Sequence, residues 1–327
     1  MRALVLGGAG FLGRHLCDRL VAAGHAVTIY GRTIPPRLAC PGGETGVRRI
    51  AGDIRDADRL GCAARGMDWV FHLAGDAAPH LSNLEAHRRL LDDLNAVVNV
   101  LDVCVTAGVR KLLFASSGGT VYGPAAAPRL SENHPTNPIC SYGIAKLAAE
   151  KYLELYRHLH GLPCAILRIA NSYGEWQRCD RGQGVITAWM SKILRGEAVT
   201  VWGDGEQVRD FVYVEDVAAA MLAAAEAAEL RHSVFNVGSG VGTSLNQLLP
   251  MLARLTGQSV AVHYRPGRRS DVSRAVLDVR RARHELGWHA QTSLELGLQR
   301  TWSWVRQGVE NPGALDGVSG HNRRACA

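Results

Sequence analysis

The sequence lacks the cysteine patterns that would indicate a metal site or a disulfide framework. Its eight cysteines are scattered along 327 residues, with no Cys-x-x-Cys pair and no histidine at metal-ligand spacing. We therefore expect no metal, and reduced thiols as in a cytoplasmic protein. The cysteines are Cys17, Cys40, Cys62, Cys104, Cys140, Cys164, Cys179 and Cys326.

A long hydrophobic run is also missing. The longest apolar stretch, Val217–Ala225, ends at Glu226 and is far shorter than the roughly 20 residues that a membrane-spanning helix needs. The segment that begins at Met1 turns into glycines before a signal-like apolar region develops. We expect a cytoplasmic protein with no membrane partner.

Lysine is rare, so arginine supplies most of the net charge of +7. The basic residues are dispersed and lack interleaved aromatic side chains, which argues against a nucleic-acid partner. A surplus of arginine suits a protein that binds diphosphates, although a codon bias would produce the same composition. The lysines are Lys111, Lys146, Lys151 and Lys192.

Short apolar runs alternate with helical stretches through the first half of the chain, which is the rhythm of a doubly wound parallel sheet. We predict an α/β fold with a Rossmann-type dinucleotide-binding domain over residues 1–170. Looser patterning then predicts a smaller, interleaved substrate-binding lobe over 171–310 and a flexible tail over 311–327. The predicted strands of the first half are Ala3–Leu6, Ala26–Tyr30, Val47–Ile50, Trp69–Leu73, Lys111–Ala115 and Cys164–Leu167; the helices are Phe11–Ala23, Asp56–Ala64, Leu84–Ala107 and Tyr142–His160.

A glycine-rich turn, Gly7–Gly13, separates the first predicted strand from the first helix. It fits both Gly-x-Gly-x-x-Gly and the wider Gly-x-x-Gly-x-x-Gly spacing. Such a turn leaves backbone N–H groups free to meet a pyrophosphate at the start of the helix, because no Cβ blocks the approach. We interpret it as a dinucleotide site; a purely structural strand–helix turn is the alternative.

The adenosine end of that site is less regular. An acidic residue at the end of the second strand would bind the ribose hydroxyls, but this strand ends in Gly31-Arg32. Arg32 either pairs with a 2′-phosphate, which would favour NADP, or stacks on adenine. Asp53 is a candidate adenine contact and equally a candidate helix cap.

Tyr142 and Lys146 are four residues apart on a predicted helix, so their side chains share one face. An ammonium about 5 Å from a phenol, at an effective dielectric of about 20, contributes roughly 3 kcal/mol, or roughly two pK units. We therefore expect Lys146 to lower the pKa of Tyr142 and make it a base for a sugar hydroxyl. A chance surface pair is the alternative, which the glycine turn far upstream disfavours.

The chain resembles the extended short-chain dehydrogenases/reductases, and among them the nucleotide-sugar epimerases of the UDP-galactose 4-epimerase type. The resemblance covers roughly residues 1–308. It rests on an ordered series of segments: Gly7–Gly13, Gly52-Asp53, His72–Ala74, Ser116–Gly123, Tyr142–Lys146, Arg168–Asn171, Trp202–Gly205, Arg209–Val217 and Glu285–Trp288.

The resemblance implies that Tyr142 accepts the proton and that Lys146 binds the nicotinamide ribose. Many relatives carry a hydroxyl residue where this chain has Gly118, so Ser117 or Thr120 would substitute, and Ser117 is favoured. A supporting helix asparagine of relatives falls on Asp93, with Asn95 nearby.

The resemblance also implies contacts for both ligands. Similarity places Trp202 against the base and the arginines on the diphosphate; for Trp202 a core role is the alternative, and for Arg209 a salt bridge with Asp210. The implied cofactor contacts are Gly7, Gly10, Phe11, Leu12, Gly13, Arg32, Asp53, Ile54, Leu73, Ala74, Gly75, Ser116, Tyr142, Lys146 and Ile169. The implied substrate contacts are Asn171, Arg178, Trp202, Arg209, Arg268 and Asp271.

The predicted function is an NAD-dependent 4-epimerase of a UDP-hexose that works through a transient 4-keto sugar. Arg178 would mark a uronate substrate, because an arginine after the corresponding Gln meets the C6 carboxylate in relatives; a solvated loop charge is the alternative. An NADPH-dependent 4-reductase and a non-catalytic dinucleotide sensor are the competing functions. The helices 84–107 and 142–160 form a dimer bundle in relatives, which implies a homodimer.

Overall fold

The computed structural model describes residues 1–35, 47–75, 83–178 and 184–310, without the side chains of 83–90 and 309–310. The predicted tail, 311–327, lies outside the described residues, as do Cys40, Cys179 and Cys326. The other five cysteines are free. None of the described helices is long and apolar enough to cross a membrane, and the described side chains contain no cluster of acids, histidines and cysteines that could hold a metal.

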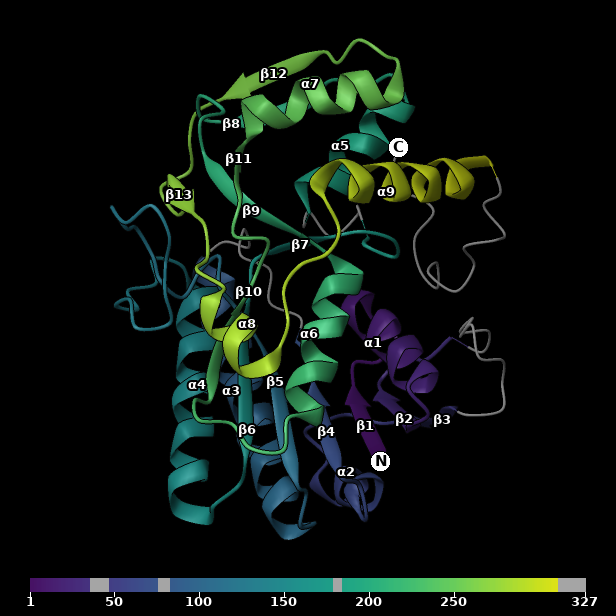
Figure 1. Cartoon of the computed structure of the whole chain (residues 1–327), viewed down its shortest axis with the longest axis vertical. Helices are drawn as coiled ribbons and strands as arrows, with labels where there is room; N and C mark the ends of the chain where they lie inside the picture. Colours follow the sequence, from purple (N-terminus) through teal and green to yellow (C-terminus); the bar gives the residue numbers. More distant parts are fainter. Residues whose placement is uncertain (36–46, 76–82, 179–183, 311–327) are drawn as a thin grey trace.

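A seven-stranded parallel sheet forms the larger part of the molecule (Figure 1). The strand order is β10-β6-β5-β4-β1-β2-β3, which confirms the doubly wound fold. The last strand comes from far along the sequence, since Val234–Val237 pairs with Ile166–Ile169. The strands are β1 Arg2–Leu6, β2 Ala26–Gly31, β3 Val47–Ala51, β4 Trp69–His72, β5 Lys111–Ser117, β6 Cys164–Ile169 and β10 Val234–Val237.

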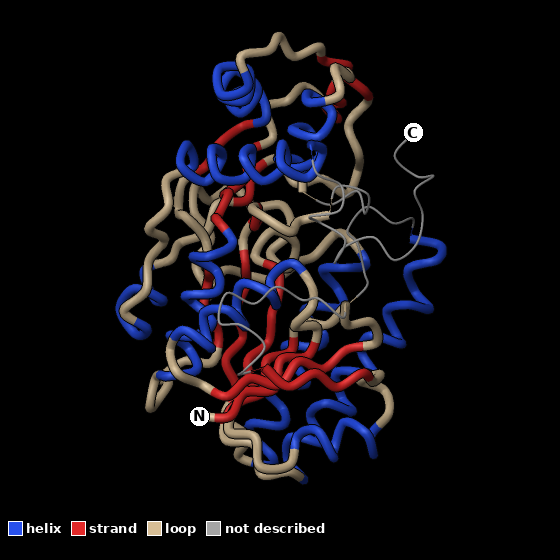
Figure 2. The backbone as a smooth tube through the Cα atoms, turned by 90° about the vertical axis from the view of Figure 1, so that its right-hand side faces the viewer, coloured by secondary structure: helices blue, strands red, loops and turns tan. Residues whose placement is uncertain are grey.

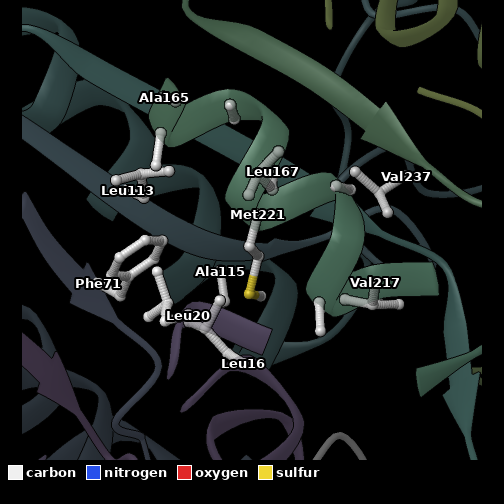
Figure 3. Packing of buried hydrophobic residues seen from close by; sticks show 14 of the residues in the cluster. Leu16, Leu20, Phe71, Leu113, Ala115, Ala165, Leu167, Val217, Met221 and Val237 are labelled. Carbon is white, nitrogen blue, oxygen red and sulfur yellow. The ribbon is translucent and has the colours of Figure 1, made fainter. Parts of the chain in front are cut away.

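Helices cover both faces of this sheet, as Figure 2 shows from the side. On one face, α1 (Phe11–Ala22) and α6 (Val214–Glu226) bury Leu16, Leu20 and Met221 against the strands (Figure 3). The opposite face carries the helices α2 Ala57–Ala64, α3 Asn83–Thr106 and α4 Ser141–His160. The strand residues are buried on both sides except in the edge strand β3, which explains the nearly continuous apolar sequence of most of the other strands.

A second layer lies beyond the carboxyl ends of the strands (Figure 1). Here β9 pairs with β7, β11 and β13, while β8 pairs with β12. Strand β10 belongs to the large sheet and α6 packs on that sheet. The chain therefore crosses between the two parts several times. The elements of this part are β7 Asn171–Tyr173, α5 Val185–Leu194, β8 Val199–Trp202, β9 Val208–Tyr213, β11 Gly242–Ser244, α7 Leu245–Thr256, β12 Val262–Arg265, β13 Arg274–Ala275 and α9 Leu294–Glu310; α8, Arg280–Leu286, packs beside β10.

Candidate active site

The glycine turn after β1 is packed so tightly that side chains are excluded from it. Gly7 has φ +83°, and a Cβ there would lie 3.0 Å from the amide nitrogen of Ala74. A Cβ on Gly13 would overlap the Gly7 carbonyl and the Gly8 backbone. Helix α1 begins at Phe11 without a side-chain cap on its first N–H groups. These groups can therefore bind an anion such as the pyrophosphate of a dinucleotide, which fits the predicted role.

At the predicted adenosine end, Asp53 of the neighbouring turn lies near the end of β2, where the expected acid is missing. Gly52 N donates to Gly31 O at 3.0 Å, which brings Asp53 beside the end of β2. The Asp53 carboxylate pairs with Arg55 at 2.6 Å, and the hydrogen bonds from Arg55, with Arg32 nearby, lower its pKa to about 2. Asp53 is not the cap of α2, because Asp56 accepts the Arg59 amide instead.

Tyr142 and Lys146 occupy the first turns of α4, next to the end of β5. Lys146 Nζ donates to the carbonyl of Ala115 at 2.8 Å and lies 5.7 Å from the centroid of the Tyr142 ring. It also lies 4.7 Å from the centroid of the Phe114 ring. The ammonium is thus fixed between the sheet and the phenol, as a shared helix face requires.

The expected fall in the pKa of Tyr142 is wrong. Burial, helped by Cys140 and Asp93, raises it to about 12. Burial also lowers the pKa of Lys146 to about 8, against the opposing charges of Asp93 and Glu150. The sequence argument counted only the attraction between phenolate and ammonium and left out the cost of removing both charges from water.

The turn after β5 explains why Gly118 replaces a hydroxyl residue. A Cβ at Gly118 would lie 2.5 Å from Leu277 and 3.0 Å from the carbonyl of Arg168. Thr120 follows, and its buried Oγ1 has no hydrogen-bond partner among the described residues. The carbonyl of Thr120 would lie 2.8 Å from a Cβ on Gly143, the residue after Tyr142. These contacts favour Thr120 over Ser117 as the neighbouring hydroxyl.

Predicted ligand contacts at the end of β6 lie beside the turn after β5. Ile169 pairs with Ser117 across the two strands, and Asn171 Oδ1 lies 3.5 Å from the position of a Gly119 Cβ. Leu73 continues from β4 and donates its amide to Leu6 O at 3.0 Å. The predicted cofactor and sugar residues of these strands therefore converge at one edge of the sheet.

Ser116 points elsewhere. Its hydroxyl donates to the buried carboxylate of Glu150 at 2.5 Å, and Arg168 donates to the same carboxylate at 2.6 Å. The sequence interpretation overlooked this cluster. Glu150 is four residues after Lys146 on the same helix, and that spacing was the signal that could have identified it.

Trp202, Arg268 and Asp271 gather in the second layer. Arg268 and Asp271 line a cavity of about 230 Å³ with Asp204, Glu206 and Gln207. The Arg268 guanidinium lies 4.1 Å from the centroid of the Trp202 ring. Since 38% of Trp202 is exposed, it is not a core aromatic.

Arg209 is not paired with its neighbour Asp210. The Asp210 carboxylate accepts Ser239 Oγ at 2.6 Å, together with the backbone amides of Ser239, Gly240 and Leu277. Burial lowers the pKa of Arg209, and the charge of Asp271 partly offsets this effect. Successive strand residues point to opposite faces, so Arg209 points away from the partners of Asp210 and lies close enough to Asp271 to feel its charge.

Arg178 lies in the segment between β7 and α5 and is partly exposed. The preceding Gln177 is buried: its Nε2 donates to Ser172 O at 3.0 Å, and its Oε1 accepts Thr187 Oγ1 at 2.6 Å. The loop therefore has a fixed base from which Arg178 extends.

Comparisons with known proteins give a consistent family. The model of the NAD dependent epimerase/dehydratase family matches residues 3–238. A UDP-glucose 4-epimerase of Mycolicibacterium smegmatis is 36% identical over 318 residues, which is 94% of this chain and 99% of that protein. The crystal structure of a UDP-glucose 4-epimerase from Thermotoga maritima with UDP-glucose is similar with TM-score 0.87 and 35% identity, over 94% of this chain and all of that one. MoeE5 in complex with UDP-glucuronic acid and NAD has TM-score 0.84 and 34% identity over 94% and 100% of the two chains.

Proposed function

Because this chain belongs to the NAD dependent epimerase/dehydratase family, we propose that it is an NAD-dependent 4-epimerase of a UDP-hexose. The observation that carries the proposal is the position of Tyr142 and Lys146. The pair lies beside the end of β5, at the edge of the sheet where the glycine turn leaves no room for a Cβ at Gly7 or Gly13. A proton acceptor and a dinucleotide cradle on one edge are what alcohol oxidation requires.

The glycine turn would hold the pyrophosphate of NAD, Asp53 and Arg32 the adenosine, and Lys146 the nicotinamide ribose. When bound, NAD supplies a hydride acceptor and a positive charge near the phenol. Tyr142 would take the proton of the C4 hydroxyl, and Thr120 Oγ1, buried without a partner among the described residues, would share it. The sugar passes through a 4-keto stage and regains hydrogen on its other face, so no net oxidation results.

The UDP part of the substrate would bind in the second layer. Trp202, with Arg268 over its ring and the cavity of Arg268 and Asp271 nearby, would bind the base, and Arg209, Arg268 and Asn171 would hold the diphosphate. Arginine suits this role because its planar fork meets two phosphate oxygens at once. The relatives named above include one with UDP-glucose and one with UDP-glucuronic acid, which supports both a hexose and a uronate as candidates.

The experiment is a substrate panel. Purified protein is incubated with UDP-glucose, UDP-galactose, UDP-glucuronate and UDP-galacturonate, and the C4 epimers are separated. Interconversion without added NADPH is expected for one pair. Consumption of NADPH with a 4-keto sugar would instead identify the reductase, and binding of NAD with no turnover of any sugar would identify a sensor. The carboxylate beside Arg32 favours NAD over NADP.

Arg178 decides between hexose and uronate. If its guanidinium binds the C6 carboxylate, Arg178→Ala should reduce kcat/KM for UDP-glucuronate by about 10²-fold and leave UDP-glucose within a few-fold, as expected for loss of a charged hydrogen bond. Equal losses for both substrates would contradict carboxylate recognition.

We also propose a cytoplasmic homodimer. Its support is an apolar stripe on α4, where Ile144, Leu155 and Leu159 are exposed. The free, buried thiols of Cys104, Cys140 and Cys164 suit a reducing compartment.

A further inference from the structure

We propose that Arg14 and Trp176 form a clamp by which the cofactor-binding end of α1 positions the sugar loop, defined as residues 174–178. The inference rests on the proposed function in one respect, because that function places Arg178 at the sugar. It assigns a positioning role to two residues outside the predicted site. The clamp makes the shape of the sugar side depend on the same helix turn that holds the cofactor.

The backbone of the sugar loop is strained at Trp176, so contacts from the surrounding structure are needed to hold its conformation. Trp176 has φ +66°, and it is the only non-glycine residue with positive φ in the described parts of the chain. A bulky side chain rarely adopts this conformation, because its Cβ crowds the backbone. Such strained residues persist where their surroundings fix them, and they cluster at functional sites.

The ring of Trp176 is held from two sides. The Arg14 guanidinium lies 4.3 Å from its centroid, and the ring of Trp304 on α9 lies 5.9 Å away at an angle of 58°. Arg14 is buried, so this cation–π contact is not weakened by water. Arg14 Nε also donates to the carbonyl of Ala9 at 3.1 Å. One guanidinium thus touches the glycine turn and the sugar loop together.

The residues on either side of Trp176 are fastened as well. The carbonyl of Glu175 accepts His15 Nε2 at 3.1 Å, and its carboxylate accepts Tyr213 Oη at 2.6 Å. Burial lowers the pKa of His15, which keeps the imidazole neutral with one N–H to donate. Gln177 is held by Thr187 and Ser172. Two of these partners, Arg14 and His15, come from the first turns of α1, so movement of α1 would be transmitted to the loop.

The first test does not depend on activity. Chymotrypsin cleavage of the peptide bond between the buried Tyr173 and Gly174, where the sugar loop begins, is timed by mass spectrometry in the full-length protein. We expect Trp176→Ala and Arg14→Met each to be cut about tenfold faster, since local opening exposes the bond. Arg19→Met is the matched control, because it removes an exposed guanidinium from the last turns of the same helix, and its cleavage rate should equal that of the wild type.

Three further variants separate the clamp from a general loss of stability. Trp176→Gly relieves the strained φ but removes the ring, so it should be cut as fast as Trp176→Ala even if it melts at the wild-type temperature. Trp176→Phe keeps a ring for Arg14 and should restore slow cleavage. The double variant Arg14→Met/Trp176→Ala should be cut no faster than the faster of the two single variants, because both single variants break the contact between Arg14 and Trp176.

Kinetics then connect the clamp to the substrate. The clamp variants should raise KM for the UDP-sugar about tenfold with a smaller change in kcat, as for a loop that positions the ground state and transition state alike. Unchanged cleavage in both single variants, or additive acceleration in the double variant, would overturn the clamp. If the wild type epimerises no sugar while the cleavage rates differ as expected, the proposed function fails and the clamp stands.

Discussion

Tyr142 must lose a proton during the proposed reaction although burial raises its pKa to about 12. Lys146 lies next to it, but burial has weakened the lysine as a cation too, with a pKa of about 8. The positive charge that lowers the cost of the phenolate must then come partly from the oxidised nicotinamide. This makes base strength conditional on bound cofactor, so the free protein should not deprotonate sugars.

Tyr142→Phe isolates that proton transfer. The variant keeps the ring and the shape of α4, so NAD should stay bound. Loss of the acceptor should reduce kcat by about 10²- to 10⁴-fold, which is the usual contribution of a positioned base. Epimerisation rate and NAD content are both measured, and Tyr152→Phe on the same helix is the control. A fully active Tyr142→Phe protein would eliminate the phenol as the base.

Asp93 sets the working pH of the pair. Its negative charge raises the pKa of both Tyr142 and Lys146. In Asp93→Asn the phenol ionises at lower pH and the ammonium is lost at lower pH, so both limbs of the pH–kcat profile should move in the acid direction by about one unit. Activity below neutral pH should rise. Asp92→Asn, an exposed neighbour on α3, is the control, and an unmoved profile in Asp93→Asn would exclude this coupling.

Helix α4 carries Tyr142 and Lys146, the proposed catalytic pair. Hydrogen bonds from two successive turns of the helix fix α4 to the sheet. The ammonium of Lys146 donates a hydrogen bond to the carbonyl of Ala115 on β5. One turn later, the carboxylate of Glu150 accepts hydrogen bonds from Ser116 on β5 and Arg168 on β6. Ser116 and Arg168 face each other in the strand register, so a single carboxylate joins both strands to the helix. The rotation of α4, and with it the direction of Tyr142, depends on these links.

Glu150→Gln should be strongly destabilising, since it leaves the Arg168 charge buried and unpaired. We expect a loss of about 3–5 kcal/mol in the free energy of unfolding, measured by urea denaturation. Glu150→Gln/Arg168→Met removes the unpaired charge as well and should recover a large part of that loss. If the two single losses simply add in the double variant, the pair does not act as a unit.

Prediction from the sequence succeeded where the signal is local. The glycine turn and the Tyr142–Lys146 spacing each need only a few neighbouring residues, and the strand–helix rhythm gives the parallel sheet. It failed for quantities set by distant contacts. The ammonium of Lys111 binds the final carbonyls of α6, including Ala224 at 3.0 Å, and nothing near Lys111 in the sequence indicates this. The sign of the Tyr142 shift depends on burial, which is a property of the folded chain.

At the scale of the whole molecule, the residues of the proposed site come both from the carboxyl ends of the parallel strands and from the second layer beyond them (Figure 1). The chain leaves the large sheet at the end of β6 and enters β7 after one residue. The sugar loop follows β7. The predicted base, cofactor turn and diphosphate ligands therefore come from segments spread over most of the chain. Cooperative folding of both layers is needed before the site exists.

The remaining exposed apolar surface is concentrated on one side. More than half of the large exposed hydrophobic residues that the structure describes lie on α3, on α4 or just before α4. On α4 the positions 144, 152, 155 and 159 fall on one stripe of the helix. An apolar stripe of this kind is typical of a subunit contact, because contiguous exposed apolar surface is unfavourable in water.

Leu155→Glu with Leu159→Glu should therefore convert a dimer into a monomer. Two carboxylates on each subunit would have to be buried against their symmetry mates, which costs more than the apolar contact returns. Sedimentation equilibrium measures the mass, and we expect the wild type near twice the chain mass of 35.3 kDa and the variant near that mass. Leu296→Glu, an exposed leucine on α9, is the matched control and should leave the dimer intact. A wild type that sediments as a monomer, or a double variant that still dimerises, would show that this stripe is not the subunit contact.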